Sequence, residues 1–186
     1  RSALSLAPER LAVVVGHGAE AVGEAARALA PEARVCLQAA QRGTGDAVRA
    51  AEWALEGFEG DVVVLFGDTP FVRADTLARL REARARHDLA VLGFEAAAPG
   101  RYGRLVTGAD GALERIVEAR DATEAELAIR LCNSGVMAAD CRTLLGLLEG
   151  LSAENAQGEH YLTEAVALAR RAGLSAGVVE CAQAET

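Results

Sequence analysis

A chain of 186 residues, of which 51% are apolar and 4% aromatic, is long enough to bury one core built mainly from Ala, Val and Leu. Its 19 basic and 27 acidic residues give a formal charge of 19 − 27 = −8. The mixing of both signs argues against a disordered acidic chain and against a nucleic-acid partner. No apolar run approaches the ~20 residues that a membrane helix needs. We therefore expect one soluble domain that neither crosses a membrane nor binds nucleic acid.

The side-chain inventory excludes several kinds of chemistry. All 19 basic residues are Arg, and the absence of Lys excludes Schiff-base chemistry and a lysine-dependent phosphate loop. The four cysteines form no C-x-x-C pair, so reduced thiols in the cytoplasm are expected rather than a zinc or redox site. The chain begins with Arg rather than Met, which we interpret as a fragment or a processed chain.

Apolar runs rich in Val alternate with stretches of helical period along the first part of the chain, a pattern typical of βα units on a largely parallel sheet. Trp53 is expected to pack into the core. The expected elements are, in chain order, a strand over 11–15, a helix over 19–29, a strand over 33–37, a helix over 44–55 and a strand over 61–66.

The second part of the chain departs from this strict alternation. Asp75 is expected to cap a helix that continues to Arg86. Two short strands over 102–106 and 113–117, with a turn at 108–111, predict an inserted β-hairpin. The other expected elements are a strand over 89–94, a strand over 131–137, a helix over 140–148, a helix over 162–172 and a strand over 176–180. These patterns predict a single α/β domain with a mostly parallel sheet and an inserted β-hairpin.

Ligands of open α/β sheets bind beyond the carboxyl ends of the strands, so the residues that follow each strand are the first functional candidates. Residues 38–45 follow one strand, and their glycines allow backbone N–H groups to approach a ligand at the start of a helix. Turn chemistry alone is the alternative explanation for these glycines.

A carboxylate, Asp68, follows the clearest strand of the sequence. No local partner neutralises it, and Mg²⁺ prefers one or two carboxylates together with phosphate oxygens, so Asp68 is a candidate metal ligand in a nucleotide site. The alternative is that Asp68 only caps a turn before Pro70.

Two further places follow later strands. Gly103 allows close backbone approach at the start of the hairpin, and Glu118 at its far end can accept hydrogen bonds from sugar hydroxyls. The alternative explanation is that Gly103 is only a glycine before a strand and that Glu118 is only a solvated side chain. Asn133 lies in an otherwise apolar strand, where a buried amide needs either a structural partner or a ligand. We group it with the polar loop over 157–163.

These places belong to six segments whose order and spacing carry a resemblance: Gln38–Gly45, Phe66–Pro70, Tyr102–Arg104, Ile116–Thr123, Cys132–Gly135 and Asn155–Thr163. The segments resemble those of the sugar-1-phosphate nucleotidylyltransferases, and most of all those of the uridylyltransferase domain of the GlmU-type N-acetylglucosamine-1-phosphate uridylyltransferases. The resemblance extends from about Leu11 to Glu185.

This resemblance implies a Rossmann-like three-layer domain in the cytoplasm. It implies that UTP and N-acetylglucosamine 1-phosphate are joined to give pyrophosphate and UDP-N-acetylglucosamine, a cell-wall precursor. Mg²⁺ would be the cofactor, and Asp68 would be the catalytic residue that holds it. The resemblance further implies nucleotide contacts for Gln38, Gly43, Thr44 and Gly67, and sugar contacts for Gly103, Glu118, Asn133, Tyr161 and Thr163.

The sequence departs from the family at both ends. The family's opening strand, its glycine-rich triphosphate loop and its C-terminal β-helix domain have no counterpart, so residues 1–186 are expected to be a nucleotidyltransferase-like domain that is truncated at both ends. Because the missing strand is central in the family's sheet, either the chain is part of a longer protein, which could assemble as a homo-oligomer, or the remaining strands close up. We favour the longer protein.

The same departures bear on activity. Without the triphosphate loop and without any Lys, we expect uridylyl transfer by this chain to be impaired. The alternatives are a non-catalytic remnant that binds sugar nucleotides and a nucleotidylyltransferase for another sugar phosphate.

Overall fold

The computed structural model describes residues 2–186 and contains eight strands and seven α-helices. The strands are β1 (Ala12–Val15), β2 (Arg34–Leu37), β3 (Asp61–Val64), β4 (Leu89–Glu95), β5 (Arg104–Thr107), β6 (Leu113–Val117), β7 (Leu131–Asp140) and β8 (Ala176–Cys181). The helices are α1 (Ala19–Leu29), α2 (Thr44–Ala50), α3 (Glu52–Leu55), α4 (Ala74–Arg84), α5 (Glu124–Leu127), α6 (Cys141–Glu149) and α7 (Glu164–Arg171), with 3-10 turns η1 (Ala3–Leu6) and η2 (Gln183–Glu185). Each strand and helix predicted from the sequence has a counterpart.

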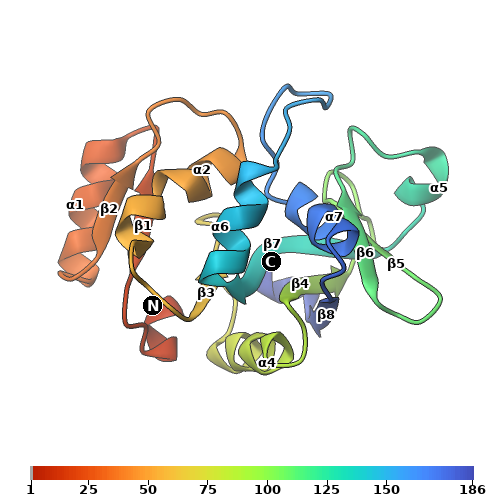
Figure 1. The fold of residues 1–186 in the computed structure, drawn as a ribbon, viewed down its shortest axis with the longest axis horizontal. Helices are drawn as coiled ribbons and strands as arrows, with labels where there is room; N and C mark the ends of the chain where they lie inside the picture. Colours follow the sequence, from red (N-terminus) through yellow and green to blue (C-terminus); the bar gives the residue numbers. More distant parts are fainter. Residues whose placement is uncertain (1) are drawn as a thin grey trace.

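The strands form a parallel pair, β1 with β2, and a larger sheet in the order β6-β5-β7-β4-β8, with β3 paired to β7 (Figure 1). The predicted α/β class with parallel pairs and an inserted hairpin, β5 with β6, is confirmed. The expectation of a mostly parallel sheet is corrected in one respect: most neighbouring strands of the larger sheet are antiparallel. In the larger sheet only β4 and β8 are parallel neighbours, because β7 runs antiparallel to β3, β4 and β5. Strands β3, β4, β5 and β8 nevertheless point the same way.

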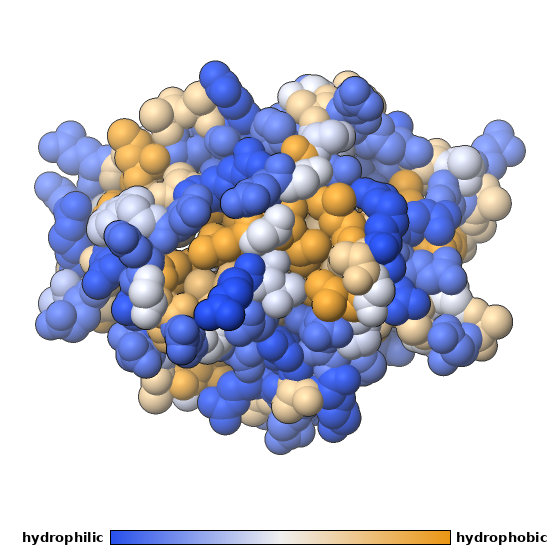
Figure 2. Space-filling model, viewed as in Figure 1, coloured by the Kyte–Doolittle hydropathy of each residue, from blue (hydrophilic) through white to orange (hydrophobic). Residues whose placement is uncertain are grey.

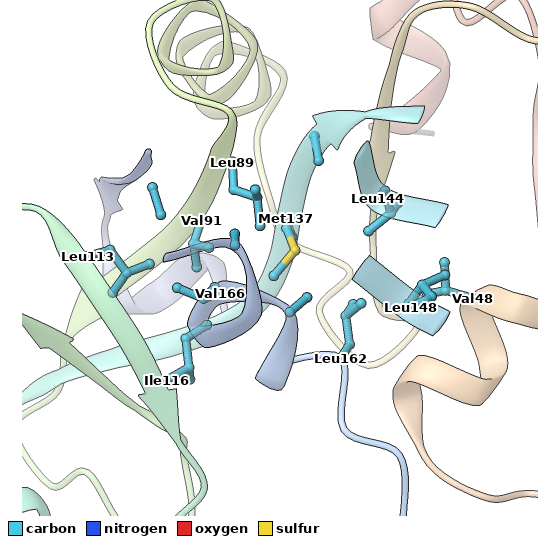
Figure 3. Packing of buried hydrophobic residues seen from close by; sticks show 14 of the residues in the cluster. Val48, Leu89, Val91, Leu113, Ile116, Met137, Leu144, Leu148, Leu162 and Val166 are labelled. Carbon is cyan, nitrogen blue, oxygen red and sulfur yellow. The ribbon is translucent and has the colours of Figure 1, made fainter. Parts of the chain in front are cut away.

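Two apolar clusters on opposite faces of the sheet produce the three layers. Alternate residues of a strand face opposite sides, so Leu89 and Val91 of β4 belong to one cluster, whereas Ala90 and Leu92 belong to the other. The first cluster contains residues of α6 and α7 and is drawn in Figure 3. The second contains residues of α4, which Figure 1 shows on the other side of β4. The three-layer arrangement of the prediction is therefore confirmed.

Several local expectations are wrong. The helix expected over 44–55 is divided at Ala51 into α2 and α3. Helix α4 begins at Ala74, so Asp75 lies inside its first turn and accepts hydrogen bonds from the Arg73 guanidinium instead of capping the helix. Trp53 is not in the core but 56% exposed, because it lies on the outer side of α3. Helix α5 was not expected, although Thr123 and Glu126 form the capping box that begins it.

The first sheet and the larger sheet do not join. In residues 2–186, β1 pairs only with β2, and β3 pairs only with β7. The remaining strands therefore do not close up around the place where the resemblance predicts another strand. The two sheets are instead separated by a groove that residues of both β1 and β3 line.

Candidate functional site

Four of the five residues predicted to contact nucleotide or metal line this groove, whose volume is about 940 Å³, and the fifth, Gly43, does not. Gln38 follows β2, Thr44 begins α2, and Gly67 and Asp68 follow β3; all four line the groove. The position agrees with the rule that ligands of α/β sheets lie beyond the carboxyl ends of strands.

Gln38 is fixed by the loop that precedes α2. Its Nε2 donates to the carbonyl oxygen of Gly43 at 3.0 Å and to Oδ2 of Asp46 at 2.9 Å. Both amide hydrogens are therefore used, and the Oε1 acceptor is left for a ligand donor such as the N–H of a pyrimidine ring. Asp46 was not among the predicted site residues, although its place three residues after Gly43 puts it on the first turn of α2.

The glycines of this loop have a structural explanation. Gly43 has φ +110°, and a Cβ on it would lie 2.5 Å from the carbonyl oxygen of His160. A Cβ on Gly45 would lie 2.3 Å from Leu151 Cδ1. The Gly45 N–H donates to His160 O at 2.8 Å, and Thr44 Oγ1 accepts from Leu162 N–H at 2.9 Å. Close packing against the segment around His160 therefore requires these glycines, and it also joins the two loops of the candidate site.

Asp68 is exposed and makes no ion pair within the described part of the chain. It does not cap the turn that precedes Pro70, because Thr69 closes that turn with both its N–H and its hydroxyl on Phe66 O. Residues 2–186 contain no group of three or more His, Cys, Asp or Glu side chains that could hold a metal. A single free carboxylate does fit Mg²⁺ whose other ligands are phosphate oxygens and water.

The residues predicted to contact the sugar come from separate elements and converge. Gly103 precedes β5, and its carbonyl oxygen accepts from the N–H of Asn133 in β7 at 2.8 Å. A Cβ on Gly103 would lie 3.6 Å from both Asn133 Cβ and Glu118 Oε2. Asn133 Oδ1 accepts from Gly135 N–H at 3.1 Å, which leaves its two amide hydrogens available.

Glu118 is the half-buried carboxyl group among these residues. Its Oε1 accepts from the hydroxyl of Thr163 at 3.0 Å. The pKa of the Glu118 carboxyl is raised overall, mainly by burial. The hydrogen bond from Thr163 acts to lower this pKa, and the nearby Asp121 raises it further. The Tyr161 hydroxyl is buried without a hydrogen-bond partner in residues 2–186, and burial together with Asp121 and Glu118 raises its pKa. An unpartnered buried hydroxyl beside a carboxylate is a place for a polar ligand.

Two side chains that the sequence did not single out hold this group in place. The Arg104 guanidinium is only 2% exposed and donates to the carbonyl oxygens of Gly100 and Tyr102, which fixes the turn that carries Gly103. Asn155 Oδ1 accepts from the N–H groups of Gln157 and Glu159 and so shapes the loop that leads to Tyr161. Both residues lie in the motifs quoted above, but their roles depend on backbone geometry.

The nucleotide group and the sugar group are neighbours rather than one cavity. The groove that contains Asp68 is not lined by Asn133. Phe66 connects the two groups, because its ring packs where a Cβ on Gly135 would lie, at 2.6 Å. Phe66 leads into Gly67 and Asp68, whereas Gly135 follows Asn133 by two residues.

Comparison with known proteins assigns the family. A model described as the MobA-like NTP transferase domain matches residues 1–133, more than half of the chain. The chain belongs to this family. It is 56% identical over 186 residues to the bifunctional protein GlmU of Ruegeria sp. (strain TM1040), and 57% identical over 187 residues to the bifunctional protein GlmU of Dinoroseobacter shibae. All of the chain is covered in both comparisons, but it spans only 41% of the length of these curated relatives.

Solved structures show the same fold at low sequence identity. A nucleoside-diphosphate-sugar pyrophosphorylase from Vibrio cholerae superposes with a TM-score of 0.68 and 15% identity over 99% of this chain and 77% of that one. A UDP-glucose pyrophosphorylase in complex with UDP-glucose gives 0.67 and 17%, over 96% of this chain and 76% of that one. The predicted Rossmann-like nucleotidyltransferase fold is thereby confirmed. In residues 2–186 no helix has the length and apolarity required to span a bilayer.

Proposed function

We propose that this domain transfers the uridylyl group of UTP to N-acetylglucosamine 1-phosphate, with release of pyrophosphate. The observation that carries the proposal is the convergence of Gly103, Glu118, Asn133, Tyr161 and Thr163 from four separate places in the chain. The identity to bifunctional GlmU proteins supports it.

The reaction needs positioning and charge neutralisation rather than a covalent intermediate. A phosphate oxygen of the sugar phosphate attacks the α-phosphorus of UTP in line, and the bond from that phosphorus to the pyrophosphate oxygen breaks. Gln38 and the Gly43–Thr44 loop would bind the uracil, and Asp68 would hold Mg²⁺. The ion, when bound, neutralises charge on the phosphates. Glu118 would accept hydrogen bonds from the amino sugar, and the Asn133 amide would donate hydrogen bonds to it.

Sugar recognition is tested by calorimetric titration of UDP-N-acetylglucosamine, UDP-glucose and GDP-mannose into the chain with Mg²⁺. We expect UDP-N-acetylglucosamine to bind most tightly. The variant Thr163→Val should weaken its binding about tenfold, because it removes a hydrogen bond that orients Glu118. The matched control is Thr107→Val, an exposed threonine on β5. Equal binding of all three sugar nucleotides, or an equal effect of both variants, would contradict the proposal.

Turnover is measured separately as pyrophosphate release from UTP and N-acetylglucosamine 1-phosphate. We expect little release by residues 1–186, since the chain has no Lys and no glycine-rich loop of the family pattern to hold the triphosphate. Rapid release would refute this expected impairment while supporting the transfer reaction. Rapid release with another sugar phosphate, but not with N-acetylglucosamine 1-phosphate, would favour the alternative of a nucleotidylyltransferase for another sugar phosphate.

A further inference from the structure

Asp46 is a half-buried carboxylate beside the nucleotide group. It is the third residue of α2, directly after the glycine loop. Figure 2 shows hydrophilic residues where Figure 1 draws α2, next to the apolar patch in the middle of this face. Within the described residues 2–186, Asp46 forms no ion pair, and the one side-chain group that donates to its carboxylate is the Gln38 amide. The contact with Gln38 is therefore the main side-chain interaction of Asp46.

Two acceptors decide which end of the Gln38 amide faces the loop. Nε2 lies 3.0 Å from the carbonyl oxygen of Gly43 and 2.9 Å from Oδ2 of Asp46. A backbone carbonyl and a carboxylate accept hydrogen bonds but donate none. If the amide were rotated by half a turn, Oε1 would face both acceptors with no hydrogen between the oxygens. The neighbours therefore hold Nε2 toward the loop and leave Oε1 for a ligand.

Of these two acceptors, Asp46 holds the amide more strongly. The carbonyl oxygen of Gly43 also accepts from the Ala47 N–H at 3.1 Å, so it is shared with the first turn of α2. A hydrogen bond to a charged acceptor is about twice as strong as one between neutral groups. The orientation of the Gln38 amide therefore depends mainly on Asp46.

We propose that Asp46 selects the base of the nucleotide by holding the Gln38 amide with Oε1 toward the ligand. Such a site accepts a hydrogen bond, so it favours a ring edge that carries an N–H, as N3 of uracil does. N3 of cytosine carries no hydrogen and would meet Oε1 as one acceptor against another, which leaves both groups unpaired. The inference rests on the proposed function, in which Gln38 binds the base, and it adds Asp46 as a positioning residue that acts through Gln38.

Asp46 also has a purely structural interpretation. An acidic residue in the first turn of a helix interacts favourably with the helix dipole, and Asp46 is the acidic residue of that turn in α2. In that role it would stabilise the chain without changing which base is bound. The preference between two bases and the orientation of the Gln38 amide therefore separate the two interpretations.

Base selection is measured by calorimetric titration of UTP, CTP and N3-methyluridine 5′-triphosphate into the chain with Mg²⁺. We expect UTP to bind at least about tenfold more tightly than the other two, because neither of them carries an N–H at N3. Equal binding of the three nucleotides would overturn the inference. A preference for UTP together with equal binding of UDP-N-acetylglucosamine and UDP-glucose would contradict the proposed sugar specificity and leave the role of Asp46 standing.

Matched variants test the role of the carboxylate. Asp46→Asn keeps the size of the side chain, but its amide can either accept from Gln38 or donate to it. We expect the preference for UTP over CTP to fall about tenfold. The control is Asp75→Asn, which replaces the acidic residue in the first turn of α4. An unchanged preference in Asp46→Asn, or an equal fall in both variants, would refute the positioning role.

A double-mutant cycle tests whether Asp46 acts through Gln38. Gln38→Met removes the amide and keeps a long side chain. In this background Asp46→Asn should not lower the preference for UTP any further, because the group that it positions is already absent. A further fall of about tenfold would show that Asp46 acts on the base by another route and would refute the inference.

Nuclear magnetic resonance of the chain without nucleotide tests the orientation of the amide directly. In the parent chain, nuclear Overhauser effects should connect the Nε2 protons of Gln38 with the β protons of Asp46. Exchange of these Nε2 protons with water should become faster in Asp46→Asn and stay unchanged in Asp75→Asn. Absence of the Overhauser effects in the parent would overturn the inference whether or not the chain binds a nucleotide, so this failure is distinct from a failure of the proposed function.

Discussion

Gly135 lies where the nucleotide and sugar groups meet, and its replacement by Ala tests the packing that joins them. The residue has φ +84°, and an added Cβ would lie 2.6 Å from Phe66 Cδ2 and 2.9 Å from Cε2. A side chain in the left-handed region costs about 1–2 kcal/mol. Displacing a packed ring adds roughly 1–3 kcal/mol. We therefore expect Gly135→Ala to lower the free energy of unfolding by about 2–5 kcal/mol.

Gly111 provides the matched control. It has φ +79°, and an added Cβ would find nothing within 4 Å. Gly111→Ala should therefore cost only the backbone contribution of about 1–2 kcal/mol. Urea unfolding followed by circular dichroism measures both variants, and their difference isolates the contact with Phe66. Equal losses in the two variants would refute the claim that the ring of Phe66 requires a glycine at this position.

A double-mutant cycle separates the ring from other effects. If the clash is with Phe66, adding Phe66→Ala to Gly135→Ala should recover about 1–3 kcal/mol relative to the sum of the single losses. Additive losses would show that the added methyl group acts on something else. Because Phe66 leads into Gly67 and Asp68, Gly135→Ala should also weaken Mg²⁺-dependent UTP binding, which the calorimetric assay measures.

Three further predictions concern charge and core packing. The pKa of Glu118 is raised in the folded state, so its ionised form opposes folding above that pKa. At pH 7 the Glu118→Gln variant should therefore unfold at a higher urea concentration than the parent. The difference between the two midpoints should vanish near pH 4, below the pKa of the unfolded chain. The pKa of Glu126 is lowered to about 2, first by the Thr123 N–H and then by hydrogen bonds from Arg115 and the Thr123 hydroxyl. Its stabilisation is therefore fully present above about pH 4.5 and is lost as the pH falls through about 2. Glu126→Gln should destabilise the chain at pH 7 and much less at pH 2. A constant difference across this range would contradict the assignment. Leu144, fully buried in the larger cluster, should lose about 2–5 kcal/mol on replacement by Ala, whereas the same change at Leu29, 63% exposed, should lose less than about 0.5 kcal/mol in the same urea assay.

The order of strands and helices was predictable because it depends on local patterns. The valine runs before residues 16 and 65 and the turn at 108–111 indicated strands and a hairpin, which the structure confirms. The residues of the candidate site were found by resemblance of six motifs. Their structural supports were harder to find, because Arg104 acts on the carbonyl oxygens of a turn and Asn155 on the N–H groups of a loop, neither of which a side-chain pattern displays.

What the sequence alone determined is the class of fold, the alternation of buried faces and the identity of the polar residues that follow strands. Period and turn chemistry are short-range properties, and they act whatever the rest of the chain does. Only the tertiary structure decided that Thr163 meets Glu118 across 45 residues of chain, that β7 runs antiparallel between β3 and β4, and that Trp53 stays exposed. It also decided which strands are neighbours, such as β3 beside β7, because strand pairing depends on which backbone groups come within hydrogen-bonding distance after the chain has folded.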